Sequence, residues 1–240
     1  MPKKLTAKTA HAQLLPSVGK VRQRGRPAML SRQAIIDRTL ELLEIRDADE
    51  VPMADVALAL GVASMSLYKY FPNREALLSA VADYAFSFLA LPEASKNWRT
   101  YLLGWLWAVQ HHADRYPVVR KVMGWEGRVP NAWLRVCAPV LELLQRQGLD
   151  GEDLVFAHNW FLSSATGLMM VEAIAPAYRG SLSISQLEGL PPDTQRIYLS
   201  IMPLLAGVDR EAILEFGFTE LIAGVERMLR SVKKNADERR

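Results

Sequence analysis

The sequence predicts an all-α protein with a small N-terminal domain of three helices and a larger C-terminal helical domain. Apolar residues recur at helical spacing along most of the chain, and no stretch alternates as a half-buried strand does. Half of the 240 residues are hydrophobic and 23% are charged, which is the composition of a folded globular protein. The predicted boundaries are 1–30 for a basic flexible arm, 31–78 for the small domain, 79–234 for the large domain and 235–240 for a tail.

The arm carries the excess positive charge of the chain. The net charge is only +3, but residues 1–30 hold seven Lys and Arg and no acidic residue. A basic arm ahead of a folded domain favours a polyanionic partner such as nucleic acid. Within it, the segment Arg24-Gly25-Arg26-Pro27 is of the kind that lies in narrow A·T-rich minor grooves, where arginine meets a strong negative potential. The alternative is a disordered, solubilising tail.

The small domain begins with a helix that Ser31 caps and whose apolar residues keep helical spacing through Leu43. The charged run 46–50 ends this helix. A second, short helix opens at Pro52, because a first turn leaves its N–H groups unbonded and proline has none to lose. Gly61 ends that helix.

A third helix is predicted from Ser64 to Phe71, where Pro72 stops it, and Asn73 caps a fourth. The second and third helices, joined through Gly61, have the spacing of a helix-turn-helix, in which glycine accepts the positive φ of the corner. The exposed face of the third helix would offer hydroxyls and a lysine to phosphates and base edges in a major groove. The residues of this face are Ser64, Met65, Ser66, Tyr68, Lys69 and Tyr70.

Residues 31–81 resemble the DNA-binding domain of the tetracycline-repressor (TetR) family. The resemblance is carried by Val56-Ala57, by Gly61-Val62 and by the run SLYKYFPNREALL at 66–78. It implies that the small domain is a helix-turn-helix that binds operator DNA.

The resemblance also implies roles for single residues. Tyr68 and Tyr70 would contact phosphates, and Arg74, where a lysine is usual, would also meet the DNA backbone. Ser64 and Met65 stand at base-reading positions. The second helix departs from the family pattern, since proline replaces the usual capping Thr or Ser at 52 and alanine stands at 54, where some members place a base-reading Arg. Few side chains are therefore left for direct readout.

The large domain is expected to contain four long helices separated by a loop. They are predicted at Trp98–Arg115, at 130–148, from 150 or 151 to about 175, and from 209 to about 233, with the loop at 176–195. Residues 165–168 and 216–224 resemble parts of the tetracycline-repressor type of C-terminal domain. That likeness implies a domain that binds a small molecule and forms a homodimer.

In that type of domain, the last two long helices of each subunit form a four-helix dimer interface. Small residues, Gly224 among them, would allow close helix contact, and an apolar stripe on the last helix would seal the interface. The alternative places the stripe in the core of a single subunit. The implied interface residues are Ser164, Gly167, Leu168, Phe218, Ile222, Val225 and Leu229.

Aromatic residues point to an effector pocket in the large domain. All six Trp lie beyond residue 97, and aromatic side chains are the usual lining of a small-molecule cavity. Ordinary core packing is the alternative. The candidate apolar lining consists of Trp105, Val109, Trp133, Cys137, Phe161, Ala165 and Met169. The candidate polar groups are His112, His158, Asn159 and Glu172.

The sequence contains no signature of an enzyme, cofactor or metal site. No phosphate-binding glycine loop, catalytic triad or zinc motif occurs, and the adjacent pair His111-His112 cannot chelate as an i, i+4 pair does. Tetracycline repressors hold a magnesium–drug complex with a histidine expected near Val119, which is absent here, so tetracycline itself is disfavoured. A helical enzyme that uses Glu126, His158 or Glu172 is the alternative class.

Together these observations predict a cytoplasmic, homodimeric DNA-binding regulator. We expect a repressor that a small hydrophobic or aromatic effector releases from operator DNA. Activation of transcription and an architectural DNA-binding role without an effector are the alternatives. No membrane association is expected, because no apolar run reaches the roughly 18 residues of a membrane span. The single Cys137 fits a reducing compartment.

Overall fold

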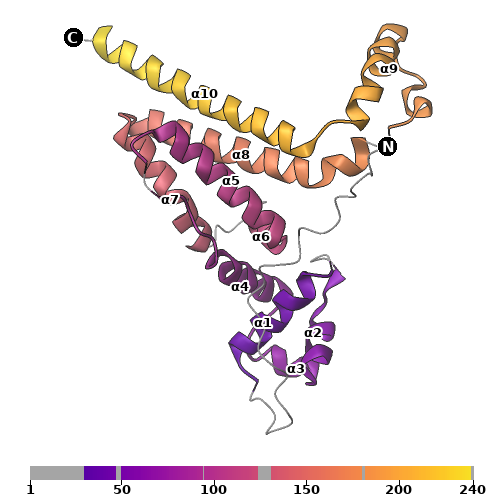
Figure 1. Cartoon of the computed structure of the whole chain (residues 1–240). Helices are drawn as coiled ribbons and strands as arrows, with labels where there is room; N and C mark the ends of the chain where they lie inside the picture. Colours follow the sequence, from indigo (N-terminus) through magenta and orange to yellow (C-terminus); the bar gives the residue numbers. More distant parts are fainter. Residues whose placement is uncertain (1–29, 47–49, 94, 124–130, 180–181, 239–240) are drawn as a thin grey trace, which may run out of the picture.

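The computed structural model describes residues 30–46, 50–93, 95–123, 131–179 and 182–238. All regular structure within these ranges is helical, which confirms the all-α prediction. Figure 1 shows the small N-terminal helices at one end of the molecule and two long C-terminal helices lying across the other.

The small domain contains α1 (Arg32–Leu43), α2 (Met53–Leu60) and α3 (Ser64–Leu67), and α4 (Arg74–Phe86) leads out of it. Capping fixes where these helices begin and end. The Ser31 side chain accepts a hydrogen bond from the Ala34 N–H at 3.1 Å, and the Asn73 side chain accepts one from the Ala76 N–H at 2.8 Å. Gly61 ends α2 in the left-handed conformation at φ +68°, as predicted for the corner.

The third helix is shorter than predicted. The α-helix ends at Leu67 and the chain continues as a turn, in which the N–H groups of Tyr70 and Phe71 both donate to the Leu67 carbonyl. Pro72 prevents the helix from continuing past this turn, because a proline disfavours the helical conformation of the residue before it, which is Phe71. The start of α2 also differs from the prediction: Pro52 is the N-cap, just outside the helix, instead of part of its first turn.

The large domain contains α5 (Trp98–Arg115), α6 (Val118–Met123), α7 (Asn131–Arg146), α8 (Gly151–Arg179), the 3-10 helix η2 (Ile184–Leu187), α9 (Pro192–Ala206) and α10 (Arg210–Glu238). α8 packs against α7 and α10, and α10 also packs against α5. In Figure 1, α9 stands apart from the other helices at the end of α8.

The structure has two helices that were not predicted, and its last helix ends later than predicted. α6 was not expected after Pro117, and α9 occupies part of the expected loop and the stretch after it. Prolines precede or open both helices, and a first turn tolerates proline because its N–H groups are unbonded. α10 runs to Glu238, so most of the predicted tail at 235–240 is helical.

α8 and α10 approach each other closely through glycine. A Cβ built on Gly224 would overlap the Trp160 ring of α8, and a Cβ on Gly217 would overlap the Leu168 side chain. Gly224 therefore serves contact within one chain. Gly167, on α8, has no such neighbour among the described residues, because none of their heavy atoms lies within 4 Å of a Cβ built there.

α8 also contradicts one expectation from the sequence. By length and composition alone, residues Gly151–Ala175 would suffice to cross a membrane, and only 28% of the apolar window is buried. The helix nevertheless packs against α7 and α10 along one side. Its apolar character comes from two faces, one buried in the domain and one exposed.

Gly224→Ala should lower the free energy of unfolding by about 1–2 kcal/mol, because overpacking outweighs the gain in helix propensity. In a Trp160→Leu background the overlap disappears, and the same change should instead raise stability. Urea unfolding of the four proteins measures both effects. The same sign in both backgrounds would show that Gly224 does not serve this contact.

Candidate nucleic-acid interface and ligand site

The α3 region presents a polar and apolar face to the outside, held from beneath by two buried side chains. Leu67 and Phe71 are fully buried in the small domain, whereas Met65 is 74% exposed and Tyr68 is 43% exposed. Lys69 is exposed as well, and Ser64 and Ser66 are half-buried. The predicted face therefore exists on the surface of the domain, at the end farthest from α10 (Figure 1).

Two of the predicted phosphate contacts also have partners inside the domain. The Tyr70 hydroxyl donates to the Leu30 carbonyl at 2.5 Å, so its proton is engaged within the protein. Arg74 Nε donates to the Val51 carbonyl at 3.1 Å, which ties the start of α4 to the segment before α2. Both residues thus have structural roles in addition to any DNA contact. Arg24 and Arg26 lie outside the described residues.

Arg32 is a residue of this surface that sequence reasoning missed. Its Nη1 donates to the Tyr70 carbonyl at 2.8 Å, and its guanidinium lies 4.2 Å from the centroid of the Phe71 ring. The contact joins the first turn of α1 to the end of the α3 region. No local pattern could reveal it, because Arg32 and Tyr70 are 38 residues apart in the sequence.

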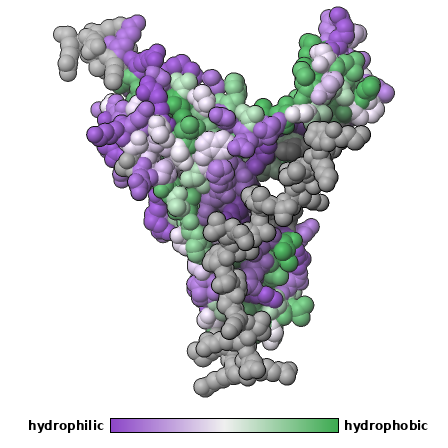
Figure 2. Space-filling model, viewed as in Figure 1, coloured by the Kyte–Doolittle hydropathy of each residue, from purple (hydrophilic) through white to green (hydrophobic). Residues whose placement is uncertain are grey.

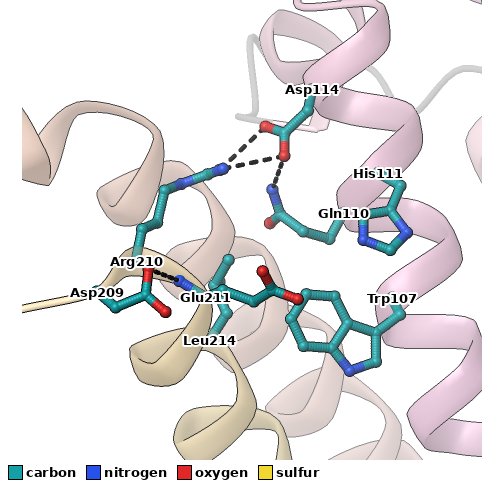
Figure 3. Close-up of a pocket in the computed structure, with 8 residues that line it drawn as sticks. All are labelled: Trp107, Gln110, His111, Asp114, Asp209, Arg210, Glu211 and Leu214. Carbon is teal, nitrogen blue, oxygen red and sulfur yellow. Dashed lines mark hydrogen bonds and ion pairs between the residues drawn. The ribbon is translucent and has the colours of Figure 1, made fainter. Parts of the chain in front are cut away.

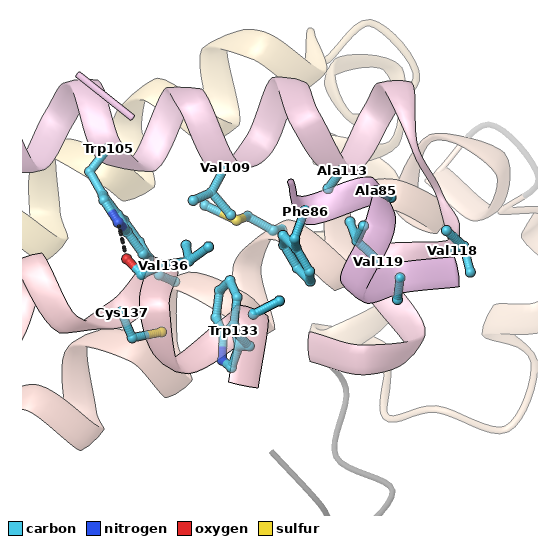
Figure 4. Packing of buried hydrophobic residues seen from close by; sticks show 14 of the residues in the cluster. Ala85, Phe86, Trp105, Val109, Ala113, Val118, Val119, Trp133, Val136 and Cys137 are labelled. Atoms are coloured by element: carbon cyan, nitrogen blue, oxygen red, sulfur yellow. Dashed lines mark hydrogen bonds between the residues drawn. The ribbon is translucent and has the colours of Figure 1, made fainter. Parts of the chain in front are cut away.

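The predicted apolar lining of the effector pocket does converge in the large domain. All seven residues are buried, and they come from α5, α7 and α8. The Trp105 ring lies 6.3 Å from that of Trp133 and 6.0 Å from that of Phe161, centroid to centroid, and its Nε1 donates to the Val136 carbonyl at 2.9 Å. Figure 4 shows part of this packing.

Phe86 extends the group to α4, and sequence reasoning did not include it. Its ring lies 5.6 Å from that of Trp133 and 5.8 Å from that of His112. We refer to Phe86, Trp105, Trp133 and Phe161 as the aromatic cluster. Through Phe86, the helix that leaves the small domain ends inside this cluster (Figure 4).

Two of the four polar candidates have a buried ring nitrogen without a partner among the described residues. His112 Nε2 and His158 Nε2 are both in this state. Burial lowers the pKa of each imidazole, so both rings favour the neutral form, although a hydrogen bond to the Ala85 backbone partly opposes this for His112. Neutral imidazole can donate to or accept from a ligand.

The other polar candidates lie elsewhere. Asn159 is exposed on the outer side of α8 and donates to the Val155 carbonyl one turn earlier. Glu172 is 2% exposed and forms an ion pair with Arg179. Cys137 belongs to the apolar lining, and burial raises the pKa of its thiol to about 12, so the thiol stays protonated. Glu126 lies outside the described residues.

The apolar stripe of α10 is core of the single chain. Phe218 and Val225 are fully buried, Ile222 is 9% exposed and Leu229 is 8% exposed. The Phe218 ring meets the Trp107 ring of α5 edge-on, with centroids 5.1 Å apart. Their burial agrees with the alternative that the stripe belongs to the core of a single subunit, because periodicity identifies a buried stripe without naming what covers it. A dimer role for these four side chains stays a prediction. Ser164 and Leu168 are half-buried in the chain.

α8 instead exposes a different stripe, which we call the α8 stripe. Its residues recur every three or four positions, so they share one side of the helix. Phe156 is 68% exposed and Ile174 is 66% exposed. The stripe consists of Phe156, Asn159, Ser163, Gly167, Met170 and Ile174.

Known proteins identify the family. The sequence profile of "Bacterial regulatory proteins, tetR family" matches residues 35–81. An uncharacterised HTH-type transcriptional regulator of Mycobacterium tuberculosis is 30% identical over 168 residues, which are 65% of this chain and 77% of that protein. This chain belongs to the TetR family. The class C tetracycline repressor of Escherichia coli is 25% identical over 224 residues, which span 87% of this chain and 99% of the repressor.

Solved structures agree with the TetR fold. Apo ActR from Streptomyces coelicolor has a TM-score of 0.69 at 20% identity, covering 85% of this chain and 99% of that one. ActR in complex with actinorhodin has a TM-score of 0.66 at 20% identity, covering 82% and 96%. Both show the same fold, an N-terminal helix-turn-helix and a larger helical domain. TetR regulators are non-enzymatic transcription factors that bind operator DNA and small molecules as dimers.

Proposed function

We propose that this protein is a cytoplasmic repressor that binds its operator as a homodimer and leaves it when a small apolar or aromatic effector enters the large domain. The supporting observation is the exposed α3 face at one end of a helix, α4, whose other end is part of the aromatic cluster. One helix thereby connects the DNA-reading surface with the candidate effector site.

On DNA, the α3 face of each subunit would enter a major groove, and the two grooves would lie about 34–36 Å apart. Tyr68 and Lys69, which are exposed, are suited to phosphate contacts. Ser64 and Met65 would meet base edges. Arg24 and Arg26 of the arm would add minor-groove contacts beside each half-site.

A Tyr68→Ala/Lys69→Ala double variant should bind its operator about tenfold or more weakly, because phosphate contacts supply affinity at any sequence. The slope of log affinity against log salt should fall by about 0.9 for each phosphate that the variant no longer neutralises. Fluorescence anisotropy with an operator duplex selected from a random pool measures both quantities.

Lys96→Ala is the matched control for this measurement. Lys96 is exposed in the segment between α4 and α5, away from α3, so its removal should leave affinity and salt slope unchanged. Equal operator affinity of the double variant and the wild type would refute the assignment of the α3 face.

The α8 stripe and its surroundings support the homodimer. The stripe has Gly167 near its middle, where the backbone is open for close approach, and large apolar side chains toward both ends. Phe216, on the neighbouring α10, is 67% exposed. α9 has no buried residue in the single chain, although it carries exposed apolar side chains such as Ile197 and Leu204. A second copy of the chain, related by a twofold axis, would cover these exposed apolar side chains. Figure 2 shows hydrophobic residues on the outside of α9.

Ile174→Glu should convert the dimer into a monomer, because each interface would bury two additional charges without partners. Operator affinity should fall with it, since a monomer occupies only one half-site. Sedimentation velocity gives the oligomeric state. Leu134→Glu on α7, where Leu134 is 53% exposed, is the control and should stay dimeric. A dimeric Ile174→Glu protein would place the interface elsewhere.

Release from DNA would follow from the contacts of α4. This helix packs against α1 in the small domain and against α6 and α7 in the large one. A ligand that separates Phe86 from Trp133 would displace the end of α4. Small rigid-body rotations of the subunits would suffice for release from DNA, because the recognition helices of both subunits must match successive major grooves at the same time. By linkage, ligand and operator must weaken each other's binding by the same factor.

Actinorhodin, which is bound in one ActR structure, is a first probe for this site in a panel of aromatic compounds. A true effector should change the tryptophan fluorescence of the free protein. Operator DNA should lower the affinity of the protein for the effector, and the effector should lower the affinity of the protein for the operator by the same factor. Equal ligand affinity with and without operator would show a pocket that is not a switch. A panel that changes neither fluorescence nor thermal stability would favour an architectural role, which the close packing of the aromatic cluster also permits.

A further inference from the structure

A cleft with a volume of about 270 Å³ lies on the other side of α5, away from the aromatic cluster. It opens between α5 and the first turns of α10 (Figure 3). Trp107, Gln110 and Asp114 line it from α5, and Asp209, Arg210 and Glu211 line it from the start of α10. The two walls are distant in sequence, so only the fold brings these side chains together.

The charge of the cleft is negative. Arg210 donates to both oxygens of Asp114 at 3.0 Å, and Arg120 of α6 donates to the same carboxylate at 2.5 Å. Burial raises the pKa of Asp114, but hydrogen bonds from Arg210 and Gln110 and the charges of Arg210 and Arg120 outweigh it and hold the pKa below its usual value. Asp209 accepts hydrogen bonds from two N–H groups in the first turn of α10. The Glu211 carboxylate has no ion pair within the described parts of the chain.

Gln110 adds an independent observation, a buried acceptor without a donor. The residue is 1% exposed, and its Nε2 donates to Asp114 at 2.9 Å. That bond fixes the orientation of the amide, because a carboxylate can only accept. Oε1 therefore has to be the other atom, and it has no partner among the described residues. In Figure 3 this oxygen points across toward the first turns of α10.

An unsatisfied buried acceptor is costly, and a donor supplied by a ligand would remove the cost. Gln110 lines the cleft, so a movement of the side chains that cover its oxygen would let a donor from a ligand reach it. A neutral or anionic ligand would gain nothing from Glu211. A ligand that carries both positive charge and N–H donors would satisfy Gln110 and Glu211 together.

Trp107 provides the apolar wall. Its ring is held edge-on against Phe218 and stacked on His111, with centroids 5.1 Å and 5.3 Å away. The Glu211 carboxylate, reaching over from α10, lies beside this ring (Figure 3). A cation next to an indole face gains cation–π attraction, and a flat apolar group can cover the remaining ring surface.

We propose that the cleft between α5 and α10 binds an organic cation, a primary or secondary ammonium group carried on an aromatic skeleton. Glu211 supplies the opposite charge, Gln110 Oε1 accepts an N–H, and Trp107 contacts the skeleton. This site is separate from the aromatic cluster, and it stands whether or not an effector binds there.

Isothermal titration calorimetry of the full-length protein with 2-naphthylmethylammonium chloride tests the proposal. The ammonium compound should bind at least about tenfold more tightly than the neutral analogue 2-naphthylmethanol and the anion 2-naphthoate, because each lacks the charge interaction. Affinity should fall with added salt. Equal binding of the three compounds, or no heat from the ammonium compound, would overturn the proposal.

Variants localise the binding. Glu211→Gln should weaken binding of the ammonium compound about tenfold, and Gln110→Leu should weaken it as well. Glu215→Gln is the matched control, because Glu215 is exposed on α10 one turn further along and outside the cleft. If the Gln110→Leu variant fails to fold, the comparison of the affinities of Glu211→Gln and Glu215→Gln for the ammonium compound still tests the proposal. An equal effect of these two substitutions would mean that only general surface charge attracts the cation.

Discussion

The architecture depends on α4, a helix of 13 residues that belongs to both halves of the protein. Its N-terminal end follows the turn after α3 directly, and Leu77 and Val81 are buried along its length. Its C-terminal end places Ala85 and Phe86 in the core of the large domain (Figure 4). Because a helix is stiff on this scale, the position of one end constrains the other. The two halves therefore cannot move as fully independent bodies.

A second constraint concerns α8 and α10. Each of these helices has an inner side, which packs against the other helix, and an outer side. Glycines at 217 and 224 let the inner sides approach until the Trp160 ring and the Leu168 side chain fill the space. The inner contact uses the stripe of α10 that periodicity singles out. What remains outside is the α8 stripe with Phe216 and the isolated α9. A protomer built in this way is stable as a unit and still carries an apolar surface that a monomer leaves in water.

Local chemistry made much of the fold predictable. The caps at Ser31 and Asn73 and the corner at Gly61 each depend on a few adjacent residues, and the structure has them where the sequence places them. The sequence did not indicate α6 and α9, because proline is typical of loops as well as of first turns. The α10 stripe was recognisable as an apolar helix face, but the spacing of its residues could not show which helix covers it; in the single chain these residues are buried.

The sites, like the helices, could be predicted from the sequence only where they depend on nearby residues. The residues of the α3 face and of the aromatic cluster could be named from spacing and composition. The role of Arg32 and the α5–α10 cleft could not, because each depends on contacts between distant segments, such as Arg210 with Asp114 at a separation of 96 residues. Phe86 was overlooked for a similar reason, since nothing near it in sequence indicates that α4 ends against Trp133.

The brevity of α3 has an evolutionary consequence. A helix of four residues cannot persist alone, so the buried side chains of Leu67 and Phe71 hold the α3 face in place. Met65, by contrast, is largely in solvent and contributes little to the core. Substitutions at such outward positions cost the fold almost nothing. Under the proposed function, such substitutions change the operator preference and leave the scaffold intact, so a duplicated copy of the gene can acquire a new target without first acquiring extra stability.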